Sequence, residues 1–380
     1  MSELYTLPDG WEWIEFSKVF DTPSSKPYQI QKTEYLESGL LPIIDQGKEF
    51  IIGYTNSIEK KYLNESNCII FGDHTRQIKY VDFDFVIGAD RTKILKEKDK
   101  NKYDLKFLYF QFLSKKIESL GYSRHFKLVK EMFFAIPSLE EQKRIVAKLD
   151  NLFAKIDKAI ALHQKNIDEA NVFMASVLND VFVEFEEKYE KIPLFDVAYV
   201  NRGKSKHRPR NDKKLFGGNY PFIQTGDVRN ANKYIDTFNE TYSEFGLSQS
   251  KLWKKATICM TIAANIGDVA ILKIDSCFPD SVVGIYSENN SNDFLYYFLL
   301  TLKQQLESQA TTTAQMNINL KVLQTIGVPL PPLKTQQKVV SYLDEISQKI
   351  EKIKQIQKEK MQSLKALKAS ILDQAFKGEL

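Results

Sequence analysis

The strongest constraint on the fold of this chain is an internal repeat. A shift of 194 residues superposes positions 139–182 on positions 333–376 without a gap. Twelve of these 44 positions hold identical residues, whereas about three matches are expected from ordinary composition. Because the two copies stand 194 residues apart, the repeat predicts a duplicated architecture in which a globule and a long segment alternate twice.

Both copies of the repeat have the pattern of a long α-helix. Apolar residues recur at steps of three and four, and neither copy contains an internal proline or glycine. Ser138 stands at the expected N-cap, and Glu141 three residues later would complete a capping box. The second copy begins after Pro332 and ends near Gly378. A helix of about 44 residues is roughly 65 Å long and cannot bury its own apolar stripe, so we expect the two helices to pack together.

An antiparallel pairing of the helices fits the order of the segments. The boundaries predict two globules and two helices, in the order 1–138, 139–188, 189–332 and 333–380. A two-fold axis would then bring the midpoint of each helix against its own equivalent. His163 and Gln357 are the equivalent polar residues at this point, and we expect them to meet and to fix the register. The alternative is that His163 leans toward solvent.

The globules themselves carry strand signals. Apolar or alternating runs bounded by turn residues predict strands at 68–71, 81–87, 258–262 and 269–274. The predicted fold class is therefore α+β, with two strand-rich domains separated by two long helices that pack as an antiparallel coiled coil with pseudo-two-fold symmetry. The two globules share only weak sequence echoes, so we expect them to recognise different things.

Composition excludes several classes of protein. The chain has 380 residues, with 53 Lys and Arg against 49 Asp and Glu, and the net charge of +4 excludes a histone-like binder. No apolar run approaches the roughly 18 residues of a membrane-spanning helix, and the first residues lack the pattern of a signal peptide. The three cysteines form no C-x-x-C pair, which favours a reducing compartment and argues against zinc. We therefore expect a soluble, cytoplasmic protein without a bound metal.

A basic loop in the second globule indicates contact with nucleic acid. Residues 202–214 hold seven Lys or Arg residues and one acid, together with Pro and Gly. Proline and glycine disfavour a helix here, and the charge density suits phosphate groups. The first globule has no such run, but its turns mix Arg, Lys and Gln, which can read base edges. A solvated polar surface is the alternative in both globules.

Catalytic motifs are missing from the sequence. The nearest approach to a P-loop, from Gly39 to Lys48, has the wrong spacing. No aspartate or asparagine precedes a Pro-Pro-aromatic motif, and no nucleophile elbow or His-Glu-x-x-His helix is present. We therefore expect a binding protein without catalysis. Two alternatives remain, namely a standalone DNA-modifying or cleaving enzyme with unrecognised catalytic residues, and a scaffold whose globules bind protein.

Two segments carry a family resemblance. Ile136–Val146 and Val328–Val340 each close a globule of about 140 residues and open a long helix. With these two segments, and with Tyr220–Asp227 and Asn317–Leu320, nearly the whole chain resembles the DNA-specificity subunit of type I restriction-modification systems.

The resemblance implies a function and a set of partners. Each globule would read one half of a bipartite, asymmetric sequence in double-stranded DNA. The helices would set the spacer between the halves and dock two modification subunits, which supply S-adenosylmethionine and methylate adenine. Restriction subunits would add ATP-driven translocation and cleavage with Mg²⁺. The chain would have no cofactor and no catalytic residue of its own.

Loop chemistry suggests which residues contact DNA. In the second globule we expect phosphate contacts from Lys204, Lys206, Arg208, Arg210, Lys213 and Lys214, and base contacts from Gln224, Thr225 and Arg229. In the first globule the candidates are Gln46, Lys48, Thr75, Arg76, Gln77, Arg91 and Arg124.

Overall fold

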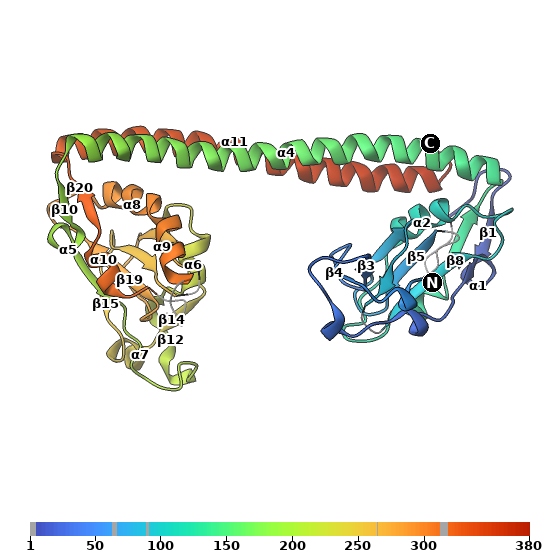
Figure 1. Ribbon diagram of the computed structural model, residues 1–380, viewed down its shortest axis with the longest axis horizontal. Helices are drawn as coiled ribbons and strands as arrows, with labels where there is room; N and C mark the ends of the chain where they lie inside the picture. The colour runs from blue at the N-terminus through green and yellow to red at the C-terminus, as the bar shows by residue number, and fades with distance from the viewer. Residues whose placement is uncertain (1–4, 63–66, 89–90, 264, 312–317) are drawn as a thin grey trace. The chain divides into compact units, whose positions relative to one another are not determined.

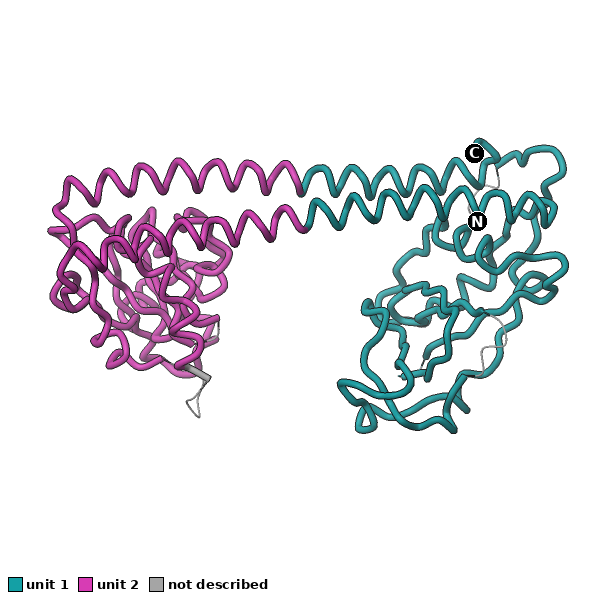
Figure 2. The backbone as a smooth tube through the Cα atoms, turned by 45° about the horizontal axis from the view of Figure 1, so that its top comes forward, with its two compact units in different colours: residues 1–164, 358–380 teal, residues 165–357 magenta. Residues whose placement is uncertain are grey.

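The computed structural model describes residues 5–62, 67–88, 91–263, 265–311 and 318–380. The chain divides into two compact units, shown in Figure 2. Unit 1 contains residues 1–164 and 358–380, and unit 2 contains residues 165–357. These units do not follow the linear segments, because each unit joins one globule to portions of both long helices.

Unit 1 contains an α+β globule (Figure 1). Its largest sheet has the order β2 (Phe20–Asp21), β8 (Thr92–Glu97), β5 (Cys68–Gly72) and β6 (Ile78–Val81). A three-stranded sheet has the order β4 (Gly53–Thr55), β3 (Leu41–Ile44) and β7 (Val86–Ile87), and β1 (Glu12–Glu15) pairs with β9 (Phe133–Ile136). The helices of the globule are α1 (Phe16–Val19), α2 (Leu105–Ser114) and α3 (Phe126–Val129).

Unit 2 contains a second α+β globule with a larger sheet. This sheet has the order β11 (Tyr199–Arg202), β19 (Val282–Tyr286), β16 (Ile258–Thr261), β17 (Val269–Leu272) and β13 (Tyr234–Ile235). A second sheet has the order β14 (Glu240–Tyr242), β12 (Phe216–Phe222), β18 (Ser276–Cys277) and β15 (Leu252–Trp253), and β10 (Lys191–Pro193) pairs with β20 (Gly327–Pro329). The helices are α5 (Leu194–Val197), α6 (Thr225–Asn230), α7 (Glu244–Ser248), α8 (Asn292–Thr301), α9 (Lys303–Thr311) and α10 (Leu320–Gln324).

The prediction of one strand over residues 81–87 was wrong. The strand β6 ends at Val81, and β7 begins at Val86 in a different sheet. Asp82 and Asp84 lie between them and are exposed. Aspartate is depleted in strands, so this short polar segment lets the chain pass from one sheet to the other.

Two long helices, α4 (Leu139–Lys188) and α11 (Leu333–Phe376), run through both units. Ser138 caps the first helix, since its hydroxyl accepts the N–H of Glu141 at 3.3 Å. The Glu141 carboxylate accepts two hydrogen bonds from the guanidinium of Arg144, each at 2.7 Å. Among the described residues, no helix has the length and apolar character needed to span a membrane.

The helices pair antiparallel within each unit, as predicted. In unit 1, Leu149 and Phe153 near the start of α4 share a core with Ile371 near the end of α11. In unit 2, Phe182 near the end of α4 shares a core with Leu343 near the start of α11. These cores also contain residues of the sheets and short helices, so each globule and its helix portions are one packed body.

The predicted contact between His163 and Gln357 would join the two units, because His163 belongs to unit 1 and Gln357 to unit 2. It stays a prediction. Within unit 2, the Gln357 side-chain oxygen accepts a hydrogen bond from the amide of Asn166 at 3.3 Å. The register of the helices near this point therefore has at least one polar contact between α4 and α11.

One pair of identical repeat residues, Gln142 and Gln336, has the same role in both units. Gln142 is buried, and its side-chain oxygen accepts the N–H of Asp104, the residue that caps α2, at 2.8 Å. Its amide group donates to the carbonyl oxygens of Lys102 and Pro137, at 2.9 and 3.0 Å. Gln142 therefore ties the start of α4 to the start of α2.

Gln336 repeats this arrangement at the start of α11. Its side-chain oxygen accepts the N–H of Ser291, the residue that caps α8, at 2.9 Å. Its amide group donates to Asn290 at 3.1 Å and to the carbonyl oxygen of Pro331 at 2.9 Å. Because a buried amide without partners is costly, these two glutamines fix how each globule meets its long helix.

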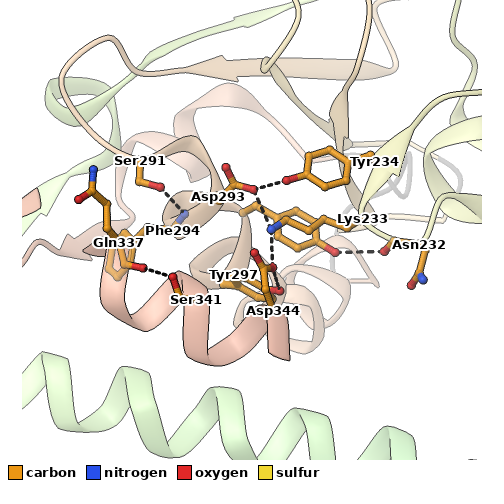
Figure 3. Close-up of polar contacts among 11 residues, drawn as sticks. Asn232, Lys233, Tyr234, Ser291, Asp293, Phe294, Tyr297, Gln337, Ser341 and Asp344 are labelled. Atoms are coloured by element: carbon orange, nitrogen blue, oxygen red, sulfur yellow. Dashed lines mark hydrogen bonds and ion pairs between the residues drawn. The ribbon is translucent and has the colours of Figure 1, made fainter. Parts of the chain in front are cut away.

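A second identical pair, Asp150 and Asp344, binds lysine in both units but in different ways. In unit 1, Lys106 from α2 pairs with Asp150 at 2.7 Å. In unit 2 the matching position of α8 is Asp293, which would repel Asp344. Lys233 resolves this conflict, since its ammonium group lies 2.7 Å from Asp293 and 2.6 Å from Asp344 (Figure 3).

The surroundings of Lys233 and Asp293 shift both pKa values. Burial alone lowers the pKa of Lys233, but the hydrogen bonds to the two carboxylates outweigh burial and raise it. Burial alone raises the pKa of Asp293, but the hydrogen bonds from Lys233 and Tyr234 outweigh burial and lower it. The hydroxyl of Tyr297 completes the network by donating to Asp344.

Replacing Lys233 with methionine tests this network. The Lys233→Met variant leaves Asp293 and Asp344 facing each other without a cation, and we expect a loss of about 2 kcal/mol in the free energy of unfolding at pH 7. The lowered pKa of Asp293 contributes stability above the ordinary carboxyl pKa of about 4, and this contribution disappears as the pH falls through the lowered value. The difference between wild type and variant should therefore narrow below about pH 4.

Urea unfolding of the full chain from pH 7 to pH 3 measures this difference. The matched control is Lys273→Met, because Lys273 and its partner Asp236 are both about half exposed. We expect the control to change the unfolding free energy by less than about 0.5 kcal/mol. Equal effects of the two substitutions, or a difference that widens in acid, would contradict the assignment.

Candidate nucleic-acid interface

The basic loop, residues 202–214, is braced from within. The His207 ring contacts the Asp212 carboxylate at 2.9 Å. The Arg208 guanidinium donates to the carbonyl oxygens of Ser205 and His207, at 2.6 and 2.8 Å. The loop continues into a short 3-10 helix at Lys213–Leu215. The predicted irregular conformation of the basic loop is confirmed, since residues 203–212 belong to no helix or strand. Hydrogen bonds of the loop's own side chains hold its shape.

The six predicted phosphate-contacting residues of the basic loop are all exposed. They differ in what they contact. Arg208 holds the loop, and one guanidinium nitrogen of Arg210, Nη2, donates to both oxygens of the Asp280 carboxylate at 2.9 and 3.0 Å. The side chains that make no hydrogen bond or ion pair with any other described residue are those of Lys204, Lys206, Lys213 and Lys214. These four ammonium groups can reach an anionic ligand without first breaking a bond.

A groove in unit 2 brings four of the predicted residues together. It has a volume of about 700 Å³, and the predicted residues that line it are Arg210, Lys213, Gln224 and Thr225. The rings of Phe222 and Tyr242 also line it, and they stack with centroids 4.0 Å apart. Candidates for phosphate and for base contact therefore share one concave surface, which we call the unit 2 groove.

Gln224 is held in place at both its backbone and its side chain. It lies between the end of β12 and the start of α6, and its N–H donates to Asp227 at 2.8 Å. Its side-chain amide donates to Glu240 at 2.6 Å. Glu240 reaches this position because it pairs directly with Phe222 in the antiparallel register of β14 and β12. Glu240 was not predicted from the sequence, since this pairing depends on the fold.

Arg229 lies outside the unit 2 groove. It is in the last turn of α6, it does not line the unit 2 groove, and its guanidinium donates to the Asn265 side chain at 2.6 Å. The six residues of α6 place Gln224 and Arg229 at opposite ends of the helix. Arg229 therefore does not share the unit 2 groove with Gln224 and Thr225.

Three of the predicted residues in unit 1 meet around His74. Gln46 follows β3, and its side-chain oxygen accepts the N–H of His74 at 3.2 Å. The Thr75 hydroxyl donates to the carbonyl oxygen of Gln46, and the Arg91 guanidinium contacts the His74 ring. We call Gln46, His74, Thr75 and Arg91 the unit 1 cluster. It joins the loop after β3 to the turn between β5 and β6 and to the segment before β8.

Asp73 connects this cluster to a further loop. Its carboxylate, which is 3% exposed, accepts the N–H of Phe126 at 2.8 Å. Its carbonyl oxygen accepts both the N–H and the ring Nδ1–H of His125 at 2.9 Å, and its own N–H donates to the carbonyl oxygen of Arg91 at 3.1 Å. His125 Nε2 in turn accepts the N–H of Leu120 at 2.9 Å. Neither Asp73 nor His125 was among the residues predicted from the sequence to contact DNA.

A buried lysine supports the loop that carries Gln46 and Lys48. Lys79 of β6 donates to the carbonyl oxygens of Asp45 and Glu49, at 2.8 and 2.5 Å. Burial lowers the pKa of Lys79, and the nearby charges of Asp45 and Glu49 oppose this effect. Lys48 is thereby presented at the surface of a braced loop, where it is exposed.

The remaining unit 1 candidates lie around the same turn. Arg76, with φ of +62°, donates to the carbonyl oxygen of Ile117 at 3.0 Å. The N–H of Gln77 donates to the Thr75 hydroxyl at 3.3 Å. Arg124 is exposed, as is the nearby aromatic ring of Tyr122. Asn317, the first residue of the segment Asn317–Leu320 that resembles the family, lies outside the described residues.

Both surfaces carry side chains that can bind nucleic acid. Exposed ammonium, guanidinium, amide and hydroxyl groups can donate to phosphates and to base edges. Within the described ranges, no group of three or more His, Cys, Asp or Glu side chains is placed to hold a metal ion. Burial raises the pKa of the Cys68 thiol to about 12, so this thiol is poorly suited to act as a nucleophile.

Comparison with known proteins identifies the family. The sequence model of the type I restriction modification DNA specificity domain matches twice, at residues 8–170 and 186–360. The specificity subunit of the Escherichia coli type I restriction enzyme EcoR124I/EcoR124II is 24% identical over 364 residues, covering 91% of this chain and 89% of that protein. The StySPI specificity subunit of Salmonella potsdam is 23% identical over 424 residues, covering 98% and 90%.

A solved structure shares the fold. It concerns complex assembly and conformational transition of the type I restriction-modification system, and one of its chains superposes with a TM-score of 0.71 at 20% identity. The superposition covers 99% of this chain and 100% of that one. Since the family model matches most of the sequence in two copies, the chain belongs to the family of type I restriction-modification DNA specificity subunits.

Proposed function

We propose that the two globules, within segments 1–138 and 189–332, each read one half of a bipartite, asymmetric target in double-stranded DNA. The observation that carries this proposal is that each unit has its own surface of braced loops with exposed cationic side chains, beside the half-buried amide of Gln46 in unit 1 and the exposed amide of Gln224 in unit 2. Braced loops suit sequence reading, because a preorganised contact loses less conformational entropy on binding.

The two surfaces differ in chemistry, which supports an asymmetric target. Unit 2 combines four lysines, whose side chains make no hydrogen bond or ion pair with the described residues, with a groove that contains the carboxylate of Glu240. Unit 1 instead presents Gln46, Thr75 and Arg91 around a histidine. Arginine suits guanine and glutamine suits adenine, so the two halves of the target should differ in sequence.

The long helices set the spacer in this proposal, with His163 and Gln357 as the register point. They also dock two modification subunits. Val172 and Phe173 on α4 are 69% and 56% exposed, and such adjacent apolar side chains suit a partner surface. The partners carry S-adenosylmethionine and methylate an adenine in each half, and restriction subunits with ATP and Mg²⁺ complete the nuclease. The complex would act on DNA in the cytoplasm.

The other two hypotheses predict different behaviour. A standalone enzyme would methylate or cleave DNA as a purified chain with S-adenosylmethionine or a metal ion alone. A protein-binding scaffold would associate with DNA weakly and without dependence on salt. A subunit of the proposed kind needs its modification partner for any reaction and binds with a steep salt dependence.

The methylome tests the proposal directly. We expect cells that express this chain with its modification subunit to contain a methylated adenine motif of two unequal halves around a fixed gap. Cells without this chain should lack the motif. Sequencing that detects N6-methyladenine makes the measurement. If the complex assembles but no bipartite motif arises, the proposed reading function is wrong.

Replacing lysines of the basic loop should weaken binding to all DNA sequences. For Lys213→Ala with Lys214→Ala we expect about a tenfold loss of affinity, and a slope of log affinity against log salt that is shallower by about 2, because each phosphate contact contributes about 0.9. Titration of the complex with DNA at several salt concentrations measures both quantities.

The matched control for this change is Lys254→Ala with Lys255→Ala, two exposed lysines of unit 2 outside the basic loop. We expect the control to leave the salt slope within about 0.5 of the wild-type value. A loss of discrimination between target and non-target DNA, with an unchanged slope, would mean that Lys213 and Lys214 contact bases.

Lengthening both helices should lengthen the spacer. Four residues inserted after Gln164 and four after Gln357, where the compact units meet in the sequence, add about one turn and about 6 Å to each helix. We expect a gap longer by about two base pairs, at roughly 3.4 Å per base pair, with both half-sites unchanged. The methylome of the variant measures the gap, and an unaltered gap would contradict the spacer role.

A further inference from the structure

We infer that Glu240 and Gln224 form one reading pair that accepts a hydrogen bond from the exocyclic amino group of an adenine or a cytosine. This inference rests on the proposed function and names a determinant of specificity within the unit 2 groove. It assigns a role to Glu240, an acidic residue in a groove that also contains Arg210 and Lys213.

The contact between the two side chains orients the amide of Gln224. Its Nε2 donates to Glu240 Oε2 at 2.6 Å. The other end of the amide, Oε1, faces the start of α6 in a capping box with Asp227, and its second lone pair is the part of the amide that can accept from a ligand. A free glutamine can contact adenine with both its donor and its acceptor. Because the donor end of the amide is bound to Glu240, Gln224 presents mainly an acceptor to a base instead of both a donor and an acceptor.

The position of the pair is fixed by a local network. Asp227 accepts the N–H of Gln224 at 2.8 Å through one oxygen and the Asn239 side chain at 3.0 Å through the other. Asn239 directly precedes Glu240, and the register of β14 on β12 sets Glu240 opposite Phe222. The amide oxygen of Gln224 is therefore anchored to the start of α6, and the carboxylate of Glu240 to the pair of β14 and β12. A specific contact needs such preorganised groups.

The charge of Glu240 determines what the pair can face. A carboxylate repels a phosphate, so this part of the groove does not suit the DNA backbone. In the major groove, the hydrogen-bond donors on base edges are the N6 amino group of adenine and the N4 amino group of cytosine. Guanine and thymine present acceptors there, and these would meet a carboxylate oxygen and an amide oxygen. The pair therefore favours adenine or cytosine and rejects the other two bases.

Base analogues test the inference once the methylome has given the half-site that unit 2 reads. Each adenine and cytosine of that half-site, except the methylated adenine, is replaced in turn by purine or by 2-pyrimidinone, which lack the amino group. We expect one position at which the wild-type complex loses about tenfold or more in methylation rate. Purine or 2-pyrimidinone at that position shows which of the two bases is read.

The Glu240→Gln complex should respond differently at the same position. A glutamine there can donate as well as accept, so we expect the loss caused by the analogue to shrink to less than about twofold. The methylome of this variant should show relaxed base identity at that position alone. The half-site read by unit 1 serves as an internal control for folding and assembly, because it should stay unchanged.

Glu244→Gln is the matched control, since Glu244 is an exposed glutamate of α7 that accepts from Tyr220 and does not line the groove. We expect its motif and analogue profile to match the wild type. If Glu240→Gln also keeps the wild-type profile while the bipartite motif persists, the reading pair is wrong and the proposed function stands. If wild type produces no bipartite motif, the proposed function fails first.

Discussion

The apolar stripe on each long helix is the constraint on which the rest of the structure depends. A single helix of this length cannot bury such a stripe alone, and within each unit Leu149 or Phe182 of α4 packs with residues of α11. The globules join the same cores. Folding of each recognition surface is therefore coupled to pairing of the helices, and the buried glutamines Gln142 and Gln336 fix the junction by hydrogen bonds.

The two units show how a duplicated scaffold carries different surfaces. Asp150 and Asp344 are equivalent positions of the repeat, and each forms an ion pair with a lysine. The lysine is Lys106 in unit 1 and Lys233 in unit 2. The loops around the sheets differ more. Unit 1 arranges Gln46 and Arg91 around a buried turn, whereas unit 2 has a lysine-rich loop beside a groove. Loops can vary in this way because they contribute few residues to the shared core.

Four of the predicted DNA-contacting residues that are close in sequence also lie close together in the structure. Arg210, Lys213, Gln224 and Thr225 were selected from loop composition, and all four line one groove. Arg229 was selected with them, but the short helix α6 carries it away from Gln224. Glu240 was missed, since only the pairing of β14 with β12 brings it to Gln224. Asp73 and His125 were missed because their contacts span about fifty residues.

The sequence by itself determined the α+β class, the two long helices, their antiparallel pairing and the family, because helical periodicity and a gap-free internal repeat can be read from the order of the residues alone. Only the tertiary structure decided which side chains share a surface and which brace the loops. Lys79 is an example, because it holds the loop of Gln46 through the carbonyl oxygens of Asp45 and Glu49. The physical reason is that strand register and loop packing arise from contacts between distant segments, and no single segment encodes them.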